Sequence, residues 1–159
     1  MSGLRVRLFL ATVFMLLLSI LPLPAFFLSL RPPFVLLLIL YIEFFLPDYF
    51  HVGLLFLLGL LLDVLLSTVL GEHAFALSFV AWIASSKARR FRLFTIGQQM
   101  ALIGFFCLTY QLVIWMVDSF SGYSIGLMVP LGSTVISILV WPWVKLLADE
   151  TLLRLAFRR

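Results

Sequence analysis

The chain is a succession of long apolar runs separated by short segments that carry most of its charged residues. A helix needs about 20 residues to cross the hydrocarbon core of a bilayer, which is about 30 Å thick. Most of the runs reach this length, so we expect an all-α integral membrane protein with six transmembrane helices. The apolar runs cover residues 8–28, 33–46, 52–70, 74–86, 98–117 and 127–147.

Two of the runs, 33–46 and 74–86, are short for a membrane span. At about 1.5 Å of rise per residue, a helix of about 14 residues is only about 21 Å long. Such segments can be thinned spans, tilted half-helices or re-entrant pieces. Four spans with two re-entrant pieces would still place both termini on the same side of the membrane. The pattern therefore leaves this arrangement open beside six spans.

The composition agrees with a membrane protein. Of the 159 residues, 64% are hydrophobic and 11% are charged, whereas a soluble domain is about half apolar and about one quarter charged. A soluble fold could not hide this much apolar surface and still keep a polar exterior. No repeat, low-complexity tract or linker interrupts the chain, so we expect a single membrane domain over residues 1–159.

The positions of the basic residues predict the orientation of the chain in the membrane. They gather before the first run, in the segment "KARRFR" (87–92) and near the C-terminal end. With six spans, every Lys and Arg except Arg31 falls on one face, which the positive-inside rule assigns to the cytoplasm. Both termini are then cytoplasmic. This topology explains the net charge of +4, and no basic patch remains that would indicate nucleic-acid binding.

The two ends of the chain need separate interpretations. The N-terminus resembles a signal peptide in its arginines, but a cut after Ala25 would require a small residue where the bulky Leu23 stands. We therefore expect an uncleaved first span. Residues 148–159 interleave charges with leucines at helical spacing, which is typical of a helix on the cytoplasmic surface of the membrane. A docking helix for a cytoplasmic partner is the alternative.

Asp63 is a carboxylate near the middle of the third apolar run. Its insertion costs about 2.5–3.5 kcal/mol at a helix centre, whereas each Leu, Ile, Phe or Val contributes about 0.3–0.6 kcal/mol, so the leucines around it can offset the cost. Gly59, Asp63, Ser67 and Gly71 recur every four residues and would form one stripe on a helix. This stripe predicts a helix-packing face. Partner binding or a conformational relay, and transport, are the other roles for Asp63.

Other charged residues within or beside the runs are also candidates for function. Glu43 lies near the inner end of the second run, where it is expected at the interface, with a pair to Lys145 or the 87–92 segment as the alternative. Arg31 is the one basic residue expected on the outer face, contrary to the positive-inside rule. A contact on the outer side, a lipid headgroup or simple snorkelling to the interface could stabilise it there. Pro32 follows it and suits a turn into a helix.

Aromatic and neutral polar residues complete the picture. Trp141 and Trp143 flank Pro142 near the cytoplasmic end of the last run, where we expect an aromatic belt at the headgroups. Gln111 should hydrogen-bond a neighbouring helix. Glu72 is expected in a solvated outer loop.

No pattern in the chain predicts chemistry. The sequence has no Ser/His/Asp set, no Gly-rich phosphate loop and no metal-ligand spacing. His51 and His73 are expected as interfacial loop residues, and neither has a second soft ligand nearby. We therefore expect no enzyme activity, no cofactor and no metal site.

Several motifs occur in an order that is similar to one known family. The order is "RPPFVLLLILY", then "GLLFLLGLLLDVLLSTVLGEHAFALSFVAW", then "QQMAL", and finally "LVWPWVKLL" with a basic tail. In this order and spacing the chain resembles the bacterial rod shape-determining protein MreD family over nearly its whole length. The most specific parts of the resemblance are Arg31-Pro32, the pattern of Gly59, Asp63 and Gly71, and Trp141-Pro142-Trp143. Ser67 joins Gly59, Asp63 and Gly71 as a candidate for helix packing or partner contact, and Glu43 is a further motif position.

The resemblance implies a function without catalysis. It implies a multi-pass protein of the bacterial inner membrane, in the cell-wall elongation machinery that keeps cells rod-shaped. The implied direct partner is the periplasmic protein MreC, and through it the actin-like MreB, the glycosyltransferase RodA and a penicillin-binding transpeptidase. The family provides no ligand or catalytic residues, so its motif positions imply only structural or partner-contact roles.

The family's fold looks like the substrate-binding component of energy-coupling vitamin transporters. A small-molecule-binding component of a membrane transporter is therefore the alternative function. The first run lacks the paired small residues with which such components dock, which weakens that alternative. The sequence leaves a homodimer open.

Overall fold

The computed structural model describes the whole chain except residues 1, 22–30, 48–50, 123–125, 127 and 154–159. All secondary structure in the described part of the chain is helical, which confirms the all-α expectation for those residues. The helices are α1 (Ser2–Ile20), α3 (Phe34–Phe45), α4 (Val52–Leu66), α5 (Glu72–Ser85), α6 (Ala88–Phe91), α7 (Ile96–Phe120), α8 (Met128–Ala148) and the π-helical turn η2 (Asp149–Leu153).

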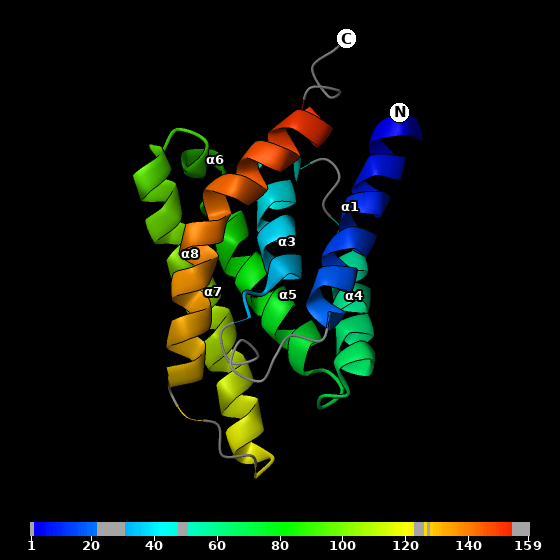
Figure 1. Cartoon of the computed structure of the whole chain (residues 1–159), viewed down its shortest axis with the longest axis vertical. Coiled ribbons are helices and arrows are strands. Elements are labelled where there is room, and N and C mark those ends of the chain that lie inside the picture. The colour runs from blue at the N-terminus through cyan, green and yellow to red at the C-terminus, as the bar shows by residue number, and fades with distance from the viewer. Residues whose placement is uncertain (1, 22–30, 48–50, 123–125, 127, 154–159) are drawn as a thin grey trace.

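The helices run alternately up and down along the long axis of the molecule (Figure 1). α1, α4 and α7 run in one direction, and α3, α5 and α8 run in the other. The start of α1, the short α6 and the end of α8 with η2 therefore lie at the same end, which we call the basic end because α6 contains Arg89 and Arg90. The turn between α4 and α5 lies at the opposite end.

Among the described residues, three helices are long and apolar enough to cross a bilayer, namely those over Gly3–Ile20, Ile96–Phe120 and Met128–Leu152. α3 and α4 are apolar but have only 12 and 15 residues, which corresponds to about 18 Å and about 22 Å of helix. The sequence had predicted a full-length third span over 52–70, but the helix ends at Leu66. Residues 22–28 of the first predicted span and residues 154–159 of the predicted surface helix lie outside the described residues.

The shortness of α3 has a structural explanation. It packs against α1, α5, α6 and α8, and most of its side chains are buried, because its sequence is apolar all round. Protein, rather than lipid, surrounds much of this helix. Near its last turn, the Phe44 ring stacks on Phe91 with centroids 3.8 Å apart, and Phe91 meets Trp141 edge-on at 6.0 Å. These rings fix α6 and α8 around the end of α3.

The outer surfaces of the other helices are apolar. Phe9 on α1, Leu57 on α4 and Leu139 on α8 are 68%, 67% and 62% exposed, and many other large apolar side chains are exposed as well. So much exposed apolar surface is rare on soluble monomers and marks contact with lipid or with partner helices. The surface fits a membrane protein.

Local signals set the start of α7. Thr95 is its N-cap and Gln98 occupies the third helical position, and together they form a capping box. Gln98 Oε1 accepts a hydrogen bond from the Thr95 N–H at 3.1 Å, so two donors that the helix leaves free are satisfied. α7 therefore begins at Ile96, slightly before the predicted apolar run.

Candidate functional site

Asp63 lies on α4 with 1% of its surface exposed and binds the start of α5. Its Oδ2 accepts a hydrogen bond from the Gly71 N–H at 2.7 Å, and its Oδ1 accepts one from the His73 N–H at 2.9 Å. The same Oδ1 lies 2.9 Å from His73 Nδ1 and accepts a weaker bond from the Thr68 hydroxyl at 3.4 Å. We call Asp63, Thr68, Gly71 and His73 the Asp63 cluster.

The negative charge of Asp63 is favourable beside the start of α5. The first N–H groups of a helix lack partners within the helix and carry a partial positive charge. Asp63 accepts bonds from two such groups at the start of α5, that of the N-cap residue Gly71 and that of His73, one with each oxygen. A carboxylate that accepts on both oxygens fits its ionised form, and the ring proton of His73 then lies on Nδ1.

The turn between α4 and α5 depends on two residues with left-handed backbone conformations. α4 ends where Ser67 adopts φ 54°, and α5 begins after Gly71, which has φ 97°. Glycine adopts positive φ at no steric cost, whereas other residues rarely do. The reversal places the start of α5 directly beside the last turns of α4.

Gly59 allows the closest approach between α4 and α5. A Cβ atom built on Gly59 would lie 2.2 Å from the Ala74 Cα and 2.6 Å from the Ala74 N. The opposing atoms belong to the backbone, which cannot move aside as a flexible side chain can. A side chain at position 59 is therefore incompatible with this helix pair, one turn away from Asp63.

The predicted stripe of small and polar residues does not lie on one helix. Gly59 and Asp63 share α4 and are buried, but Ser67 is exposed at the end of that helix. Gly71 lies beyond the turn, and it meets Asp63 through its N–H rather than through helical spacing. The four-residue spacing therefore identified residues around a helix reversal.

The sequence patterns did not predict two members of the Asp63 cluster. His73 was expected as an interfacial loop residue, but it lies on α5 and is 9% exposed. Thr68 was not singled out. Gly71 between two apolar runs is a turn signal, and a tight turn there would place the residues after it beside Asp63.

Glu72, expected to be solvated, is 2% exposed, and its carboxylate has no hydrogen-bond partner.

Arg31 joins α1 to α7 and α8. Its Nη2 donates hydrogen bonds to the carbonyls of Leu18 and Leu21 at 3.0 Å and 2.6 Å, where a cation is favourable beside a helix C-terminus. Its own carbonyl accepts a hydrogen bond from the Ser133 hydroxyl at 2.5 Å, and Gln111 donates to Ser133 at 2.8 Å. Partial burial lowers the pKa of Arg31. The predicted contact of Gln111 with a neighbouring helix is confirmed.

Pro32 is buried beside Arg31. Its carbonyl accepts a hydrogen bond from the Phe34 N–H at 2.9 Å, at the start of α3. The expected turn into a helix therefore lies at this position.

Glu43 is 3% exposed, contrary to its expected interfacial position, and neither of its carboxylate oxygens has a hydrogen-bond partner. The expected alternative pair with Lys145 is not formed. Lys145 instead donates to Gln99 Oε1 at 3.0 Å and lies 5.4 Å from the centroid of the Phe45 ring. These contacts connect α8 to α7 and α3.

The two tryptophans of the "WPW" motif have different environments. Trp141 is fully buried against Phe91, so it is not part of an aromatic belt. Trp143 is 70% exposed, as a residue at the headgroups would be. Pro142 lies between them inside α8 and removes one backbone donor from that helix.

In the part of the chain that the structure describes, no three His, Cys, Asp or Glu residues are grouped so that they could hold a metal ion. The Asp63–His73 pair is an isolated pair whose atoms already bind the α4–α5 turn. The pair holds α4 and α5 together, and the edge of the His73 ring that carries Nε2 remains free of Asp63.

Comparison with known proteins gives two matches. The family model of the rod shape-determining protein MreD matches residues 3–150. The Rod shape-determining protein MreD of Haemophilus influenzae is 31% identical over 130 residues, which cover 82% of this chain and 80% of that protein. No solved structure matches, so the expected likeness to transporter substrate-binding components stays a prediction.

Proposed function

Because the chain belongs to the rod shape-determining protein MreD family, we propose that it acts in maintaining cell shape as a non-catalytic membrane scaffold of the bacterial cell-wall elongation machinery. The match over residues 3–150 is the observation that carries this proposal. The proposed direct partner is MreC. MreB, RodA and a penicillin-binding transpeptidase would be reached through MreC.

The proposed topology has six passes through the bacterial inner membrane with both termini in the cytoplasm. Two observations support it. The alternating helix directions bring the start of α1 and the end of α8 to the same end (Figure 1). α6, with Arg89 and Arg90, lies at that end too, and basic segments are retained on the cytoplasmic side.

A scaffold role fits the chemistry of the Asp63 cluster. Both oxygens of Asp63 accept hydrogen bonds from backbone N–H groups, and the carboxylate is almost inaccessible. A general base needs a free acceptor within reach of a substrate proton. We propose that Gly59, Asp63 and Gly71 serve packing within the chain, and that partner contacts lie elsewhere.

The partner contact is proposed on the outward apolar faces of the helices. A single transmembrane helix of MreC would bind through van der Waals packing, since lipid provides no hydrophobic driving force between helices. α1, α4 and α8 each present such a face, with Phe9, Leu57 and Leu139 as exposed examples.

Depletion of the protein in its host tests the shape function. We expect depleted cells to lose their rod shape and the protein to copurify with MreC from detergent extracts. Cells that stay rod-shaped after depletion, with no second copy of the gene, would contradict the proposal.

Site-specific photo-crosslinking tests the partner contact. A photoreactive residue at position 9, 57 or 139 should crosslink MreC from one helix face and not from the others. Ala76 on α5, which is fully buried, provides the matched negative control position. Copurification without a crosslink from any outward face would place the contact outside these helices.

A further inference from the structure

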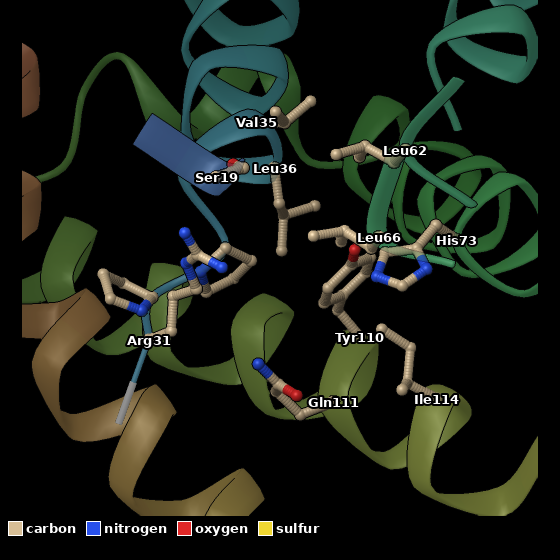
Figure 2. Close-up of a pocket in the computed structure, with 12 residues that line it drawn as sticks. Ser19, Arg31, Val35, Leu36, Leu62, Leu66, His73, Tyr110, Gln111 and Ile114 are labelled. Carbon is tan, nitrogen blue, oxygen red and sulfur yellow. The ribbon is translucent and has the colours of Figure 1, made fainter. Parts of the chain in front are cut away.

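A cavity of about 140 Å³ lies between α1, α3, α4, α5 and α7. Part of its wall is apolar, formed by leucine, valine, isoleucine and proline side chains. The polar groups that line it are Ser19, Arg31, His73, Tyr110 and Gln111. Figure 2 shows the guanidinium of Arg31 on one side, with the Tyr110 hydroxyl and the His73 ring opposite and the Gln111 amide beside the gap.

The described residues that line this cavity include a cationic group without a carboxylate to balance it. Among the described residues that line the cavity, Arg31 is the one lysine or arginine, and no Asp or Glu contributes. Its hydrogen bonds to Leu18 and Leu21 go to neutral carbonyls, and its Nε has no partner. Among the described residues, no carboxylate forms an ion pair with Arg31.

The polar groups of the cavity also retain hydrogen-bonding capacity. Within the described part of the chain, the Tyr110 hydroxyl and the Ser19 hydroxyl make no hydrogen bond to a protein atom. Gln111 uses its amide nitrogen on Ser133 and His73 uses Nδ1 on Asp63, which leaves the Gln111 oxygen and His73 Nε2. Among the described residues that line the cavity, Arg31 Nε is buried without a partner, and buried polar groups are normally satisfied. The other groups face the cavity, where a polar occupant could accept or donate hydrogen bonds with them.

The size of the cavity limits that occupant. An apolar cavity of about 150 Å³ accommodates a benzene ring, so roughly the same number of heavy atoms fits here. We propose that this cavity binds a small anionic group, a carboxylate or a phosphate, attached to a short apolar body, with Arg31 as the counter-charge. The group is either a free small molecule or the headgroup of an anionic lipid. This inference does not rest on the shape function.

Thermal unfolding of the purified full-length protein in a neutral detergent tests the proposal, because a ligand that binds only the folded state raises the unfolding temperature. The probes are hexanoate, inorganic phosphate, dihexanoyl phosphatidic acid and, as a neutral lipid, dihexanoyl phosphatidylcholine. We expect at least one anionic probe to raise the unfolding temperature in a saturable manner, and phosphatidylcholine to have no such effect.

Two variants and one control connect the binding to the cavity. Arg31→Gln should weaken binding of the anion about tenfold or more, because a hydrogen bond to a charged group is lost. Tyr110→Phe keeps the ring and removes the hydroxyl, and should weaken binding about threefold or more. Arg7→Gln is the matched control, since Arg7 also donates to a backbone carbonyl, that of Thr151 at 3.3 Å, but does not line the cavity.

The outcomes separate the sources and decide the proposal. A shift with hexanoate or inorganic phosphate supports a free small molecule, and a shift with phosphatidic acid alone supports a lipid headgroup. If no anionic probe shifts the wild type, the proposal is overturned. It is equally overturned if Arg31→Gln and Tyr110→Phe bind like the wild type; where Arg31→Gln fails to fold, Tyr110→Phe decides the question.

Discussion

Replacement of Gly59 by alanine tests the packing of α4 against α5 most directly. The added Cβ would lie 2.2 Å from the Ala74 Cα, whereas carbon atoms in contact lie about 3.5–4.0 Å apart. The two helices would have to separate by more than about 1 Å, because the obstacle is backbone. Overpacking of this kind costs about 1–3 kcal/mol and occasionally more.

The helix propensity of alanine acts in the opposite direction. Alanine is about 0.8–1.0 kcal/mol more favourable than glycine inside a helix, so the net loss of stability for Gly59→Ala should be about 0–2 kcal/mol. Gly53 is the matched control, since it lies on the same helix and a Cβ there would meet nothing within 4 Å. Gly53→Ala should leave the stability unchanged or raise it by up to about 1 kcal/mol.

Equilibrium unfolding in mixed detergent micelles, followed by far-ultraviolet circular dichroism, measures both variants. The separation of α4 and α5 should also lengthen the bonds of Asp63 to Gly71 and His73, so Gly59→Ala should support cell shape less well than Gly53→Ala. If the two variants unfold at the same denaturant concentration, the close approach of α4 to Ala74 is not the constraint described above.

Three further predictions use the same unfolding assay. Asp63→Asn should destabilise the protein by about 1–3 kcal/mol, because its amide nitrogen would face a backbone donor; a neutral result would contradict the hydrogen-bond pattern. Trp141→Ala should cost about 3–5 kcal/mol, since Trp141 is fully buried, whereas the exposed Trp143→Ala should stay within about 0.5 kcal/mol; equal effects would refute this contrast. Gln99→Leu should cost about 1–3 kcal/mol by removing the acceptor of Lys145, and added Lys145→Met should restore most of the loss; no rescue would show that the pair is not coupled.

Replacement of Asp63 by asparagine illustrates what the tertiary structure adds to the sequence. From the sequence, a packing role for Asp63 suggests that asparagine, which keeps the size and a hydrogen-bonding group, would suffice. The structure shows that both oxygens act as acceptors toward N–H donors. An amide can offer one acceptor oxygen only, so either orientation of asparagine places a donor against a donor.

The apolar runs by themselves determined the helical class and the approximate positions of the helices. This succeeds because long apolar segments must form helices in lipid, where every backbone polar group needs an internal partner. The predicted third span extended too far because Val69 and Leu70, which lie in the turn after α4, are apolar. Hydropathy measures burial in lipid or protein and does not distinguish a helix from a tight reversal.

Only the tertiary structure decided which polar residues meet. Asp63 and His73 are ten positions apart on two helices, and Arg31 and Ser133 are much further apart in the chain. Their contacts depend on the left-handed turn at Gly71 and on the packing of α8 beside α3. Sequence spacing reports neighbours within one helix, whereas these contacts join different helices, so the fold itself had to bring them together.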